Sequence, residues 1–230
     1  EFQVELPMQT LFERPTVAEL AELVTQCLAM RVADGETIHL LTESAIIPRR
    51  SGTEPCPLSF AQQRLWFLDQ VEPGNPAYNM HLALRLTGML HEEALEHSLN
   101  EILRRHEALR TTFRTVDGQP VQVISPLQPL RLPVVDLTRL PVSDRQAEAL
   151  RLASEEIVRP FHLVHGPLFR VTLLQLDAEE HLLLLTMHHI VSAGWSIGIF
   201  IKEMATFYNA FSRAEESSLP ELPIQYADFA

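Results

Sequence analysis

Two adjacent histidines, His188 and His189, close a continuous apolar run and stand directly before a loop that contains Gly194. An imidazole changes its protonation state near neutral pH, so this position suits proton transfer or a hydrogen bond to a reacting group. Successive side chains of a strand point to opposite faces, so the two rings cannot face one cavity. We expect one ring to face a cavity and the other to pack or hydrogen-bond behind it. The alternative is that both are ordinary core histidines.

The segments on either side of the pair have clear patterns. Residues 181–188 are almost all apolar, which is typical of a strand buried on both faces. After Gly194, apolar residues recur with the i, i+3, i+4, i+7 spacing of a helix that packs on a core. These are Ile197, Phe200, Ile201, Met204, Phe207, Tyr208 and Phe211. A buried strand and a packed helix would therefore hold the two histidines in place.

Upstream of this region the chain alternates between helix and strand patterns. Ser59 is a good N-cap for a helix with Phe60, Arg64 and Phe67 on one face and Ala61, Leu65 and Leu68 on another. An arginine flanked by apolar residues in this way is more often structural than catalytic. Residues 79–86 alternate as a half-buried strand does, and residues 91–105 show a helical stripe.

The next segments continue this mixture. Residues 108–114 have strand character, and Asp117-Gly118 predicts a hairpin turn. We expect Ser143 or Asp144 to cap a further helix whose apolar face carries Ala147, Leu150, Ala153 and Ile157. A strand follows at 168–176. The predicted class is α/β (α+β), with one mixed sheet and helices laid on it.

Composition excludes several classes of protein. The 230 residues carry a net charge of −12, which argues against nucleic acid as a partner. The longest apolar run is too short to span a bilayer, so no membrane is expected. Cys27 and Cys56 lie far apart and near no histidine pair, which predicts neither a disulfide nor a metal site. Two thiols of this kind suit a reducing, cytoplasmic location.

The first fifty residues differ from the rest of the chain. Thr16 and Glu19 have capping-box spacing, ahead of a helical apolar stripe formed by Val17, Leu20, Leu23, Val24 and Leu28. Residues 31–54 lose periodicity and contain glycine, proline and serine, as linkers do. We therefore expect a helical unit at 1–30, a linker at 31–54 and a main domain at 55–230. Both ends have the character of a piece cut from a larger protein.

Four stretches then fall into a recognisable order. Ser59-Phe60-Ala61-Gln62-Gln63-Arg64-Leu65-Trp66-Phe67-Leu68 resembles the first core motif of condensation domains of nonribosomal peptide synthetases. Arg105-His106-Glu107-Ala108-Leu109-Arg110-Thr111-Thr112-Phe113 resembles the second. Met187-His188-His189 through Gly194-Trp195-Ser196 resembles the third, the HHxxxDG signature, and Tyr226-Ala227-Asp228-Phe229-Ala230 resembles the start of the fourth. Each motif alone is weak, but the four together are specific.

The resemblance implies a fold and a set of partners. The fold would be the N-terminal lobe of a chloramphenicol acetyltransferase-like pair, with residues 1–30 similar to the closing helices of a peptidyl carrier domain. Partners would be donor and acceptor carrier domains bearing 4′-phosphopantetheine, the C-terminal lobe of the same domain, and an adjacent adenylation domain. No cofactor would bind this chain directly. Because the active site of the family lies between two lobes, we expect the 230-residue piece to be inactive alone.

The resemblance also assigns residues to the reaction, which is amide formation between two carrier-bound thioesters. His189 would deprotonate or orient the attacking amine, and His188 would be structural. Gly194 would let the backbone approach the substrate closely, and Trp195 belongs to the same supporting set. Arg64 is the candidate partner of the motif aspartate.

That aspartate position is Ala193 in this chain, and alanine accepts no hydrogen bond from an arginine. An engineered change, natural divergence and natural loss of activity all remain open as explanations. A non-catalytic carrier-docking module is therefore an alternative function, and an epimerisation domain of the same fold is another. A cyclisation domain is disfavoured because that branch replaces the two histidines with aspartates. A free acyltransferase using coenzyme A fits poorly with the carrier-like residues 1–30.

Overall fold

The computed structural model describes residues 16, 18, 19, 21, 22, 25, 47–50, 56–216 and 219–230. The chain divides into two compact units, Glu1–Ile46 and Ile47–Ala230. In the first unit the predicted capping box is present: the Thr16 hydroxyl accepts from the Glu19 N–H at 3.3 Å, and the Glu19 carboxylate accepts from the Thr16 N–H at 3.2 Å. The apolar stripe predicted to follow it lies outside the described residues, as does Cys27.

The second unit is built around a four-stranded sheet in the order β2-β7-β6-β5. Its strands are β2 (Asn79–Thr87), β5 (Val134–Asp136), β6 (Phe169–Asp177) and β7 (Glu180–His188). All neighbours are antiparallel except β5 and β6, which are parallel. The register pairs Asn79 with His188. The histidine pair therefore lies at the sheet end where β7 finishes and β2 begins.

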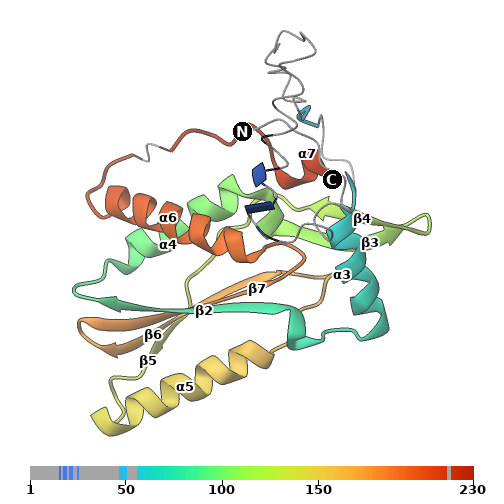
Figure 1. Ribbon diagram of the computed structural model, residues 1–230. Helices are drawn as coiled ribbons and strands as arrows, with labels where there is room; N and C mark the ends of the chain where they lie inside the picture. Colours follow the sequence, from blue (N-terminus) through green and yellow to red (C-terminus); the bar gives the residue numbers. More distant parts are fainter. Residues whose placement is uncertain are drawn as a thin grey trace. The chain divides into compact units, whose positions relative to one another are not determined.

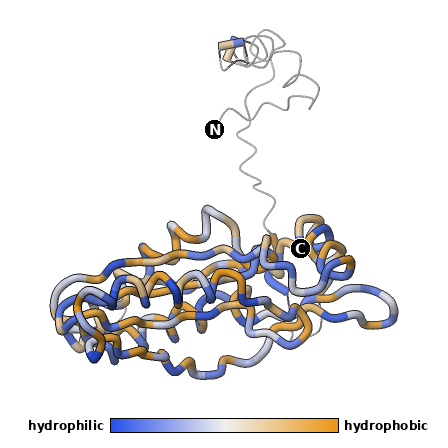
Figure 2. The backbone as a smooth tube through the Cα atoms, turned by 90° about the horizontal axis from the view of Figure 1, so that it is seen from below, coloured by the Kyte–Doolittle hydropathy of each residue, from blue (hydrophilic) through white to orange (hydrophobic). Residues whose placement is uncertain are grey.

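Helices cover both faces of this sheet (Figure 1). Helices α4 (Glu92–Arg105) and α6 (Gly194–Phe211) pack on one face, and α5 (Val142–Val158) packs on the other. Leu183 and Leu185 of β7 join the core beneath α4 and α6, whereas Leu184 joins the cluster beneath α5. The prediction that this strand is buried on both faces is confirmed. In Figure 2, hydrophobic and hydrophilic stretches alternate along the elements, as expected where each buries one side.

The prediction of a single sheet was wrong. A second, three-stranded sheet has the order β1-β4-β3, with β1 (Cys56–Pro57), β3 (Thr111–Val116) and β4 (Gln119–Ile124). The predicted turn joins β3 to β4, with positive φ at both Asp117 (49°) and Gly118 (78°). Strand β1 is only two residues long, which is too short to show an alternating pattern. The sequence therefore did not reveal that a third strand pairs with the hairpin of β3 and β4.

Helix α3 (Phe60–Val71) packs beside this second sheet through Trp66 and the buried Gln62. These two residues lie on a third side of the helix, which belongs to neither predicted face. Phe60, Arg64 and Phe67 share its exposed side, as their spacing indicates. Short turns complete the unit: η1 (Pro76–Tyr78), η2 (Glu107–Arg110) and α7 (Tyr226–Phe229).

Helix α5 differs from its prediction. It begins after Pro141, and neither Ser143 nor Asp144 caps it. Ala147 and Leu150 are exposed, while Ala149 is fully buried. The face toward the sheet carries Arg145, whose guanidinium donates to the backbone carbonyls of residues 138, 140 and 176. A charged residue on the buried face breaks the apolar periodicity, so the predicted stripe was partly wrong: Ala153 packs on the cluster beneath α5, but beside Ala149 and Leu152.

No helix in the described part of the chain has both the length and the apolar character needed to cross a bilayer.

Candidate functional site

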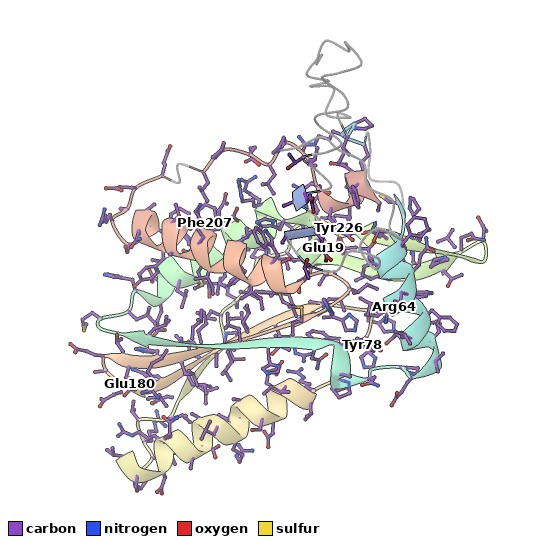
Figure 3. All side chains as sticks on the ribbon, viewed as in Figure 1. Glu19, Arg64, Tyr78, Glu180, Phe207 and Tyr226 are labelled. Carbon is purple, nitrogen blue, oxygen red and sulfur yellow. The ribbon has the colours of Figure 1, made fainter. Side chains whose placement is uncertain are left out.

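A cavity of about 420 Å³ lies between α3, the loop of residues 189–193 and the first turn of α6. Arg64, Tyr78, His189, Ser192, Ala193 and Tyr226 are among its lining residues. Figure 3 labels three of them: Arg64 on α3, Tyr78 at the end of η1 and Tyr226 on α7. The cavity thus combines residues from the first, third and fourth motifs, and its lining residues span positions 61 to 226 of the sequence.

His189 follows the last residue of β7 and is exposed in this cavity. Its backbone N–H donates to the Tyr78 carbonyl at 2.8 Å, which ties the loop to the turn before β2. Its ring Nδ1 lies 2.7 Å from the carbonyl oxygen of Ser192. A carbonyl oxygen can only accept, so Nδ1 carries the proton. In the neutral ring, Nε2 is therefore the free lone pair, available to accept a proton or a hydrogen bond.

His188 faces the opposite way, as the strand alternation predicted. Its side chain is buried, and its Nδ1 accepts a hydrogen bond from the Ile190 N–H at 3.1 Å. The rings of Tyr78 and Phe161 lie 6.2 and 6.1 Å from it, centre to centre. Burial, with a smaller contribution from the neighbouring His189, lowers the pKa of His188 to about 4. His188 is thus a neutral ring at pH 7 that anchors the turn behind the cavity.

A buried amide network supports the same loop, and sequence reasoning missed it. Ser59 and Gln62 form a capping box at the start of α3. The Gln62 side-chain amide donates to Gln122 on β4 at 3.0 Å and to the Ile190 carbonyl at 3.5 Å. Gln122 donates in turn to the carbonyl of Pro57 at 2.9 Å. The Ser-x-x-Gln spacing was a readable signal for the cap, whereas the contacts to β4 and to the loop arise only on folding.

The second motif lies outside the cavity and holds structure together. Arg105 and Glu203 are both buried, and their side chains form an ion pair at 2.9 Å between α4 and α6. The second carboxylate oxygen of Glu203 lies 2.6 Å from Nε2 of His106. The backbone of Arg105 accepts from the Gln225 side chain, directly before α7. This network therefore anchors the segment that carries Tyr226, whose hydroxyl lies 2.8 Å from the Ser59 hydroxyl.

The predicted supporting residues are placed in different ways. Ala193 is the N-cap residue of α6 and lines the cavity together with Arg64. The Ser196 hydroxyl accepts from the Ala193 N–H at 3.1 Å. The Ala193 methyl group, in turn, cannot accept a hydrogen bond from the backbone of the first turn of α6. Gly194 and Trp195 are not among the residues that line this cavity. A Cβ at Gly194 would meet no atom of the described chain within 4 Å, and Trp195 is 84% exposed.

Residues 53–230 match the sequence profile of the family described as the condensation domain. The chain belongs to this family. Among curated relatives of this condensation domain, one of the linear gramicidin synthase proteins of Brevibacillus parabrevis is 45% identical over 229 residues. That match covers 100% of this chain and 3% of the relative. Phosphinothricin tripeptide synthetase PhsC of Streptomyces viridochromogenes is 48% identical over 185 residues, covering 80% of this chain and 17% of the relative.

Solved condensation-domain structures agree with the fold. The starter condensation domain of rhizomide synthetase RzmA has a TM-score of 0.69 at 25% identity, covering 74% of this chain and 41% of that one. The X-domain from teicoplanin biosynthesis has a TM-score of 0.69 at 31% identity, covering 80% and 38%. The predicted α/β class and family are confirmed. This chain spans well under half the length of these relatives.

Proposed function

We propose that the condensation domain to which this chain contributes forms amide bonds between two carrier-bound acyl groups, with His189 as the residue that acts on the amine. The observation that carries the proposal is the orientation of His189. Its Nδ1–H is occupied by the Ser192 carbonyl, and its ring is exposed in a cavity, so Nε2 is the atom that meets substrate. The synthetases that resemble this chain support the reaction class.

His189 is the one acid–base group that the proposed reaction requires. The amine nitrogen of the acceptor attacks the carbonyl carbon of the donor thioester, forming a C–N bond. Nε2 of His189 accepts a proton or a hydrogen bond from that nitrogen as it acquires positive charge. The C–S bond then breaks, and the departing thiolate takes up the proton. His188 stays neutral behind the loop, where its hydrogen bond from Ile190 keeps the backbone of the loop in place.

The partners that we propose follow from tethered substrates. Donor and acceptor peptidyl carrier domains would present their acyl groups on 4′-phosphopantetheine arms, with the reacting ends in the cavity of about 420 Å³. We assign residues 1–30 to the end of a carrier domain, 31–54 to a linker and 55–230 to the first lobe of the condensation domain. The second lobe and an adenylation domain would complete the module, in the cytoplasm.

Direct product analysis tests the function. The full-length protein that contains this chain is incubated with one carrier loaded as donor and one as acceptor, and the dipeptidyl thioester is sought by mass spectrometry. We expect product with the parent and a large loss in His189→Gln. We also expect no product from residues 1–230 alone, because the proposed active site requires a second lobe. Product formation by the His189→Gln variant at the parental rate would refute the assignment.

Ala193 favours a second candidate, a carrier-docking module without chemistry. This module would bind loaded carriers and give no dipeptidyl thioester. An epimerisation domain would instead exchange the proton on the α-carbon of a bound aminoacyl group. Running the same incubation in D₂O separates the three functions, since only epimerisation introduces deuterium at that carbon.

A further inference from the structure

The charge of the His189 cavity is opposite to that of the protein. The chain carries a net charge of −12, yet none of the described residues that line the cavity is an aspartate or glutamate. Among these described lining residues, Arg64 is the one with a permanent charge. Within the described part of the chain, no ion pair or hydrogen bond involves the Arg64 guanidinium, while most other arginines have a carboxylate partner. The cavity therefore has among its lining residues an exposed cation, Arg64, and the proposed reacting residue, His189.

The helix presents Arg64 to the cavity in a defined way. Five residues of α3 line the cavity: Ala61, Gln62, Arg64, Leu65 and Leu68. All but Gln62 have the i, i+3, i+4, i+7 spacing of one helix face. The adjacent side of the helix is fixed by the capping box at Ser59 and by the buried amide of Gln62. His189 faces the same space from the loop after β7. Arg64 and His189 thus line the same cavity from separate elements.

Ala193 leaves this positive charge unbalanced. Its side chain lines the cavity at the N-cap of α6, where a longer acidic residue would stand within the same space. A methyl group neither neutralises a guanidinium nor fills the room that a ligand group needs. The first turn of α6 also contains no acidic residue. Among the described residues that line the cavity, none therefore offers a carboxylate to Arg64.

We infer that this cavity selects a substrate whose acyl or aminoacyl group carries a carboxylate, which Arg64 binds in bidentate fashion. The inference rests on the proposed function, because it assigns a substrate class to the same site. A phosphodiester on the carrier arm has similar chemistry. However, the phosphate stands at the far end of the arm from the thioester, whereas Arg64 shares one cavity with the residue that acts at the thioester. A carboxylate on the acyl group is thus the ligand that fits.

The test compares substrates that differ only in charge. Carriers loaded with aspartyl or asparaginyl groups are presented to the full-length protein, first as donor and then as acceptor, and kcat/KM for amide formation is measured. We expect at least a tenfold preference for the aspartyl group in one of the two positions. Arg64→Gln should remove that preference, and Arg64→Lys should retain part of it. An equal loss for both substrates in Arg64→Gln would assign Arg64 to the arm phosphate and overturn the inference.

Position 193 provides a second pair of variants. Ala193→Asp places a carboxylate in the cavity, where it competes with the substrate for Arg64 and should abolish the preference. Ala193→Asn has nearly the same shape without the charge and should leave the preference intact. If Ala193→Asp and Ala193→Asn behave alike, charge at this site does not select the substrate.

A binding measurement separates this inference from the proposed function. Non-reactive amide-linked analogues of aspartyl and asparaginyl N-acetylcysteamine are titrated into the same protein by calorimetry. Tighter binding of the aspartyl analogue, lost in Arg64→Gln, supports the carboxylate site even if no amide product forms. Equal binding of both analogues, together with normal amide formation, would overturn the inference and leave the proposed function standing.

Discussion

The Nδ1 atom of His189 donates to the carbonyl oxygen of Ser192, three residues further along the chain, at 2.7 Å. This short bond fixes both the tautomer and the direction of the ring. The loop that carries it is held from behind by the Ile190 N–H, which donates to His188, and from the side by Gln62. In the proposed reaction, Nε2 is the ring nitrogen left to act on the amine, because Nδ1 is occupied by Ser192.

The first prediction separates these two nitrogen atoms. In His189→Asn, the side-chain amide can still donate to Ser192, but nothing replaces Nε2. We expect amide formation to fall by about 100- to 10,000-fold, the range typical for loss of a general base or acid. The thermal midpoint should stay close to that of the parent because the loop keeps its hydrogen bond. Single-turnover product formation and thermal unfolding of the same samples measure the two effects.

His189→Gln is the complementary variant, since its amide reaches toward the Nε2 position but titrates no proton. Residual activity that is independent of pH in His189→Gln would indicate that the residue orients the amine. Equal activity of the parent and His189→Asn would show that Nε2 has no role.

The second prediction concerns His188 and acid. Burial lowers its pKa in the folded protein to about 4, against 6.5 for an exposed histidine. Between these values the unfolded chain binds the proton and the folded chain does not, so stability falls as the pH drops from about 6.5 to about 4. The full effect is about 3 kcal/mol. Urea unfolding at a series of pH values should show this loss.

The matched variant is His188→Asn, whose side-chain oxygen can accept from the Ile190 N–H but does not titrate. Its stability should depend less steeply on pH over this interval than that of the parent. The difference between the two curves removes the contribution of carboxylates, which titrate in both proteins. Parallel curves would show that His188 is not the group responsible.

Much of the fold was readable because its elements bury one apolar stripe each. The strand before His188 and the helix after Gly194 were placed from periodicity alone, and both agree with the structure. The failures occur where polar residues are buried. Arg145 faces the sheet from α5, and Gln62 faces β4 from α3, so neither helix shows its true face in its hydrophobic pattern. Burial of a polar group depends on partners that are distant in sequence.

The site was readable to a similar degree. His188 and His189 were separated correctly by strand alternation, a local rule. The roles of Gln62, Gln122 and Tyr226 were not visible, because their contacts join α3, β4 and α7 across 60 to 167 positions. The Arg105-His106 motif was recognised, but its role in binding Glu203 needs the packing of α4 on α6.

The third prediction tests that packing. Glu203→Gln removes the charge that pairs with the buried Arg105, and the side chains of both residues are almost fully covered. An unpaired buried charge is costly, so we expect a loss of about 3–5 kcal/mol in the free energy of unfolding. Chemical denaturation measures it. The control is Glu101→Gln, which breaks the more exposed ion pair between Glu101 and Arg104 on the same helix. This variant should lose about 0–1 kcal/mol in the free energy of unfolding. Similar losses of stability in Glu203→Gln and Glu101→Gln would contradict the prediction, because burial would then add nothing to the cost of breaking the Arg105 ion pair.

The fourth prediction concerns the cap of α6. Ala193 has extended backbone angles (φ −136°, ψ 169°) at the N-cap position, and its methyl group leaves the first-turn N–H groups without a side-chain acceptor at that residue. Ala193→Asp supplies one and adds a negative charge at the positive end of an 18-residue helix. We expect a gain of about 1 kcal/mol in the free energy of unfolding, measured by urea denaturation at pH 7.

Ala193→Asn separates the two contributions, because asparagine caps nearly as well as aspartate but carries no charge. Both variants should therefore stabilise the protein, with aspartate retaining an advantage that shrinks as salt is added. Ala193→Val, which offers no acceptor, should give no gain. Stabilisation by valine equal to that by aspartate would show that side-chain bulk, and not capping, is what position 193 lacks. A loss of stability in Ala193→Asp would show that the helix start has no room for a longer side chain, and the acidic cap would then be excluded.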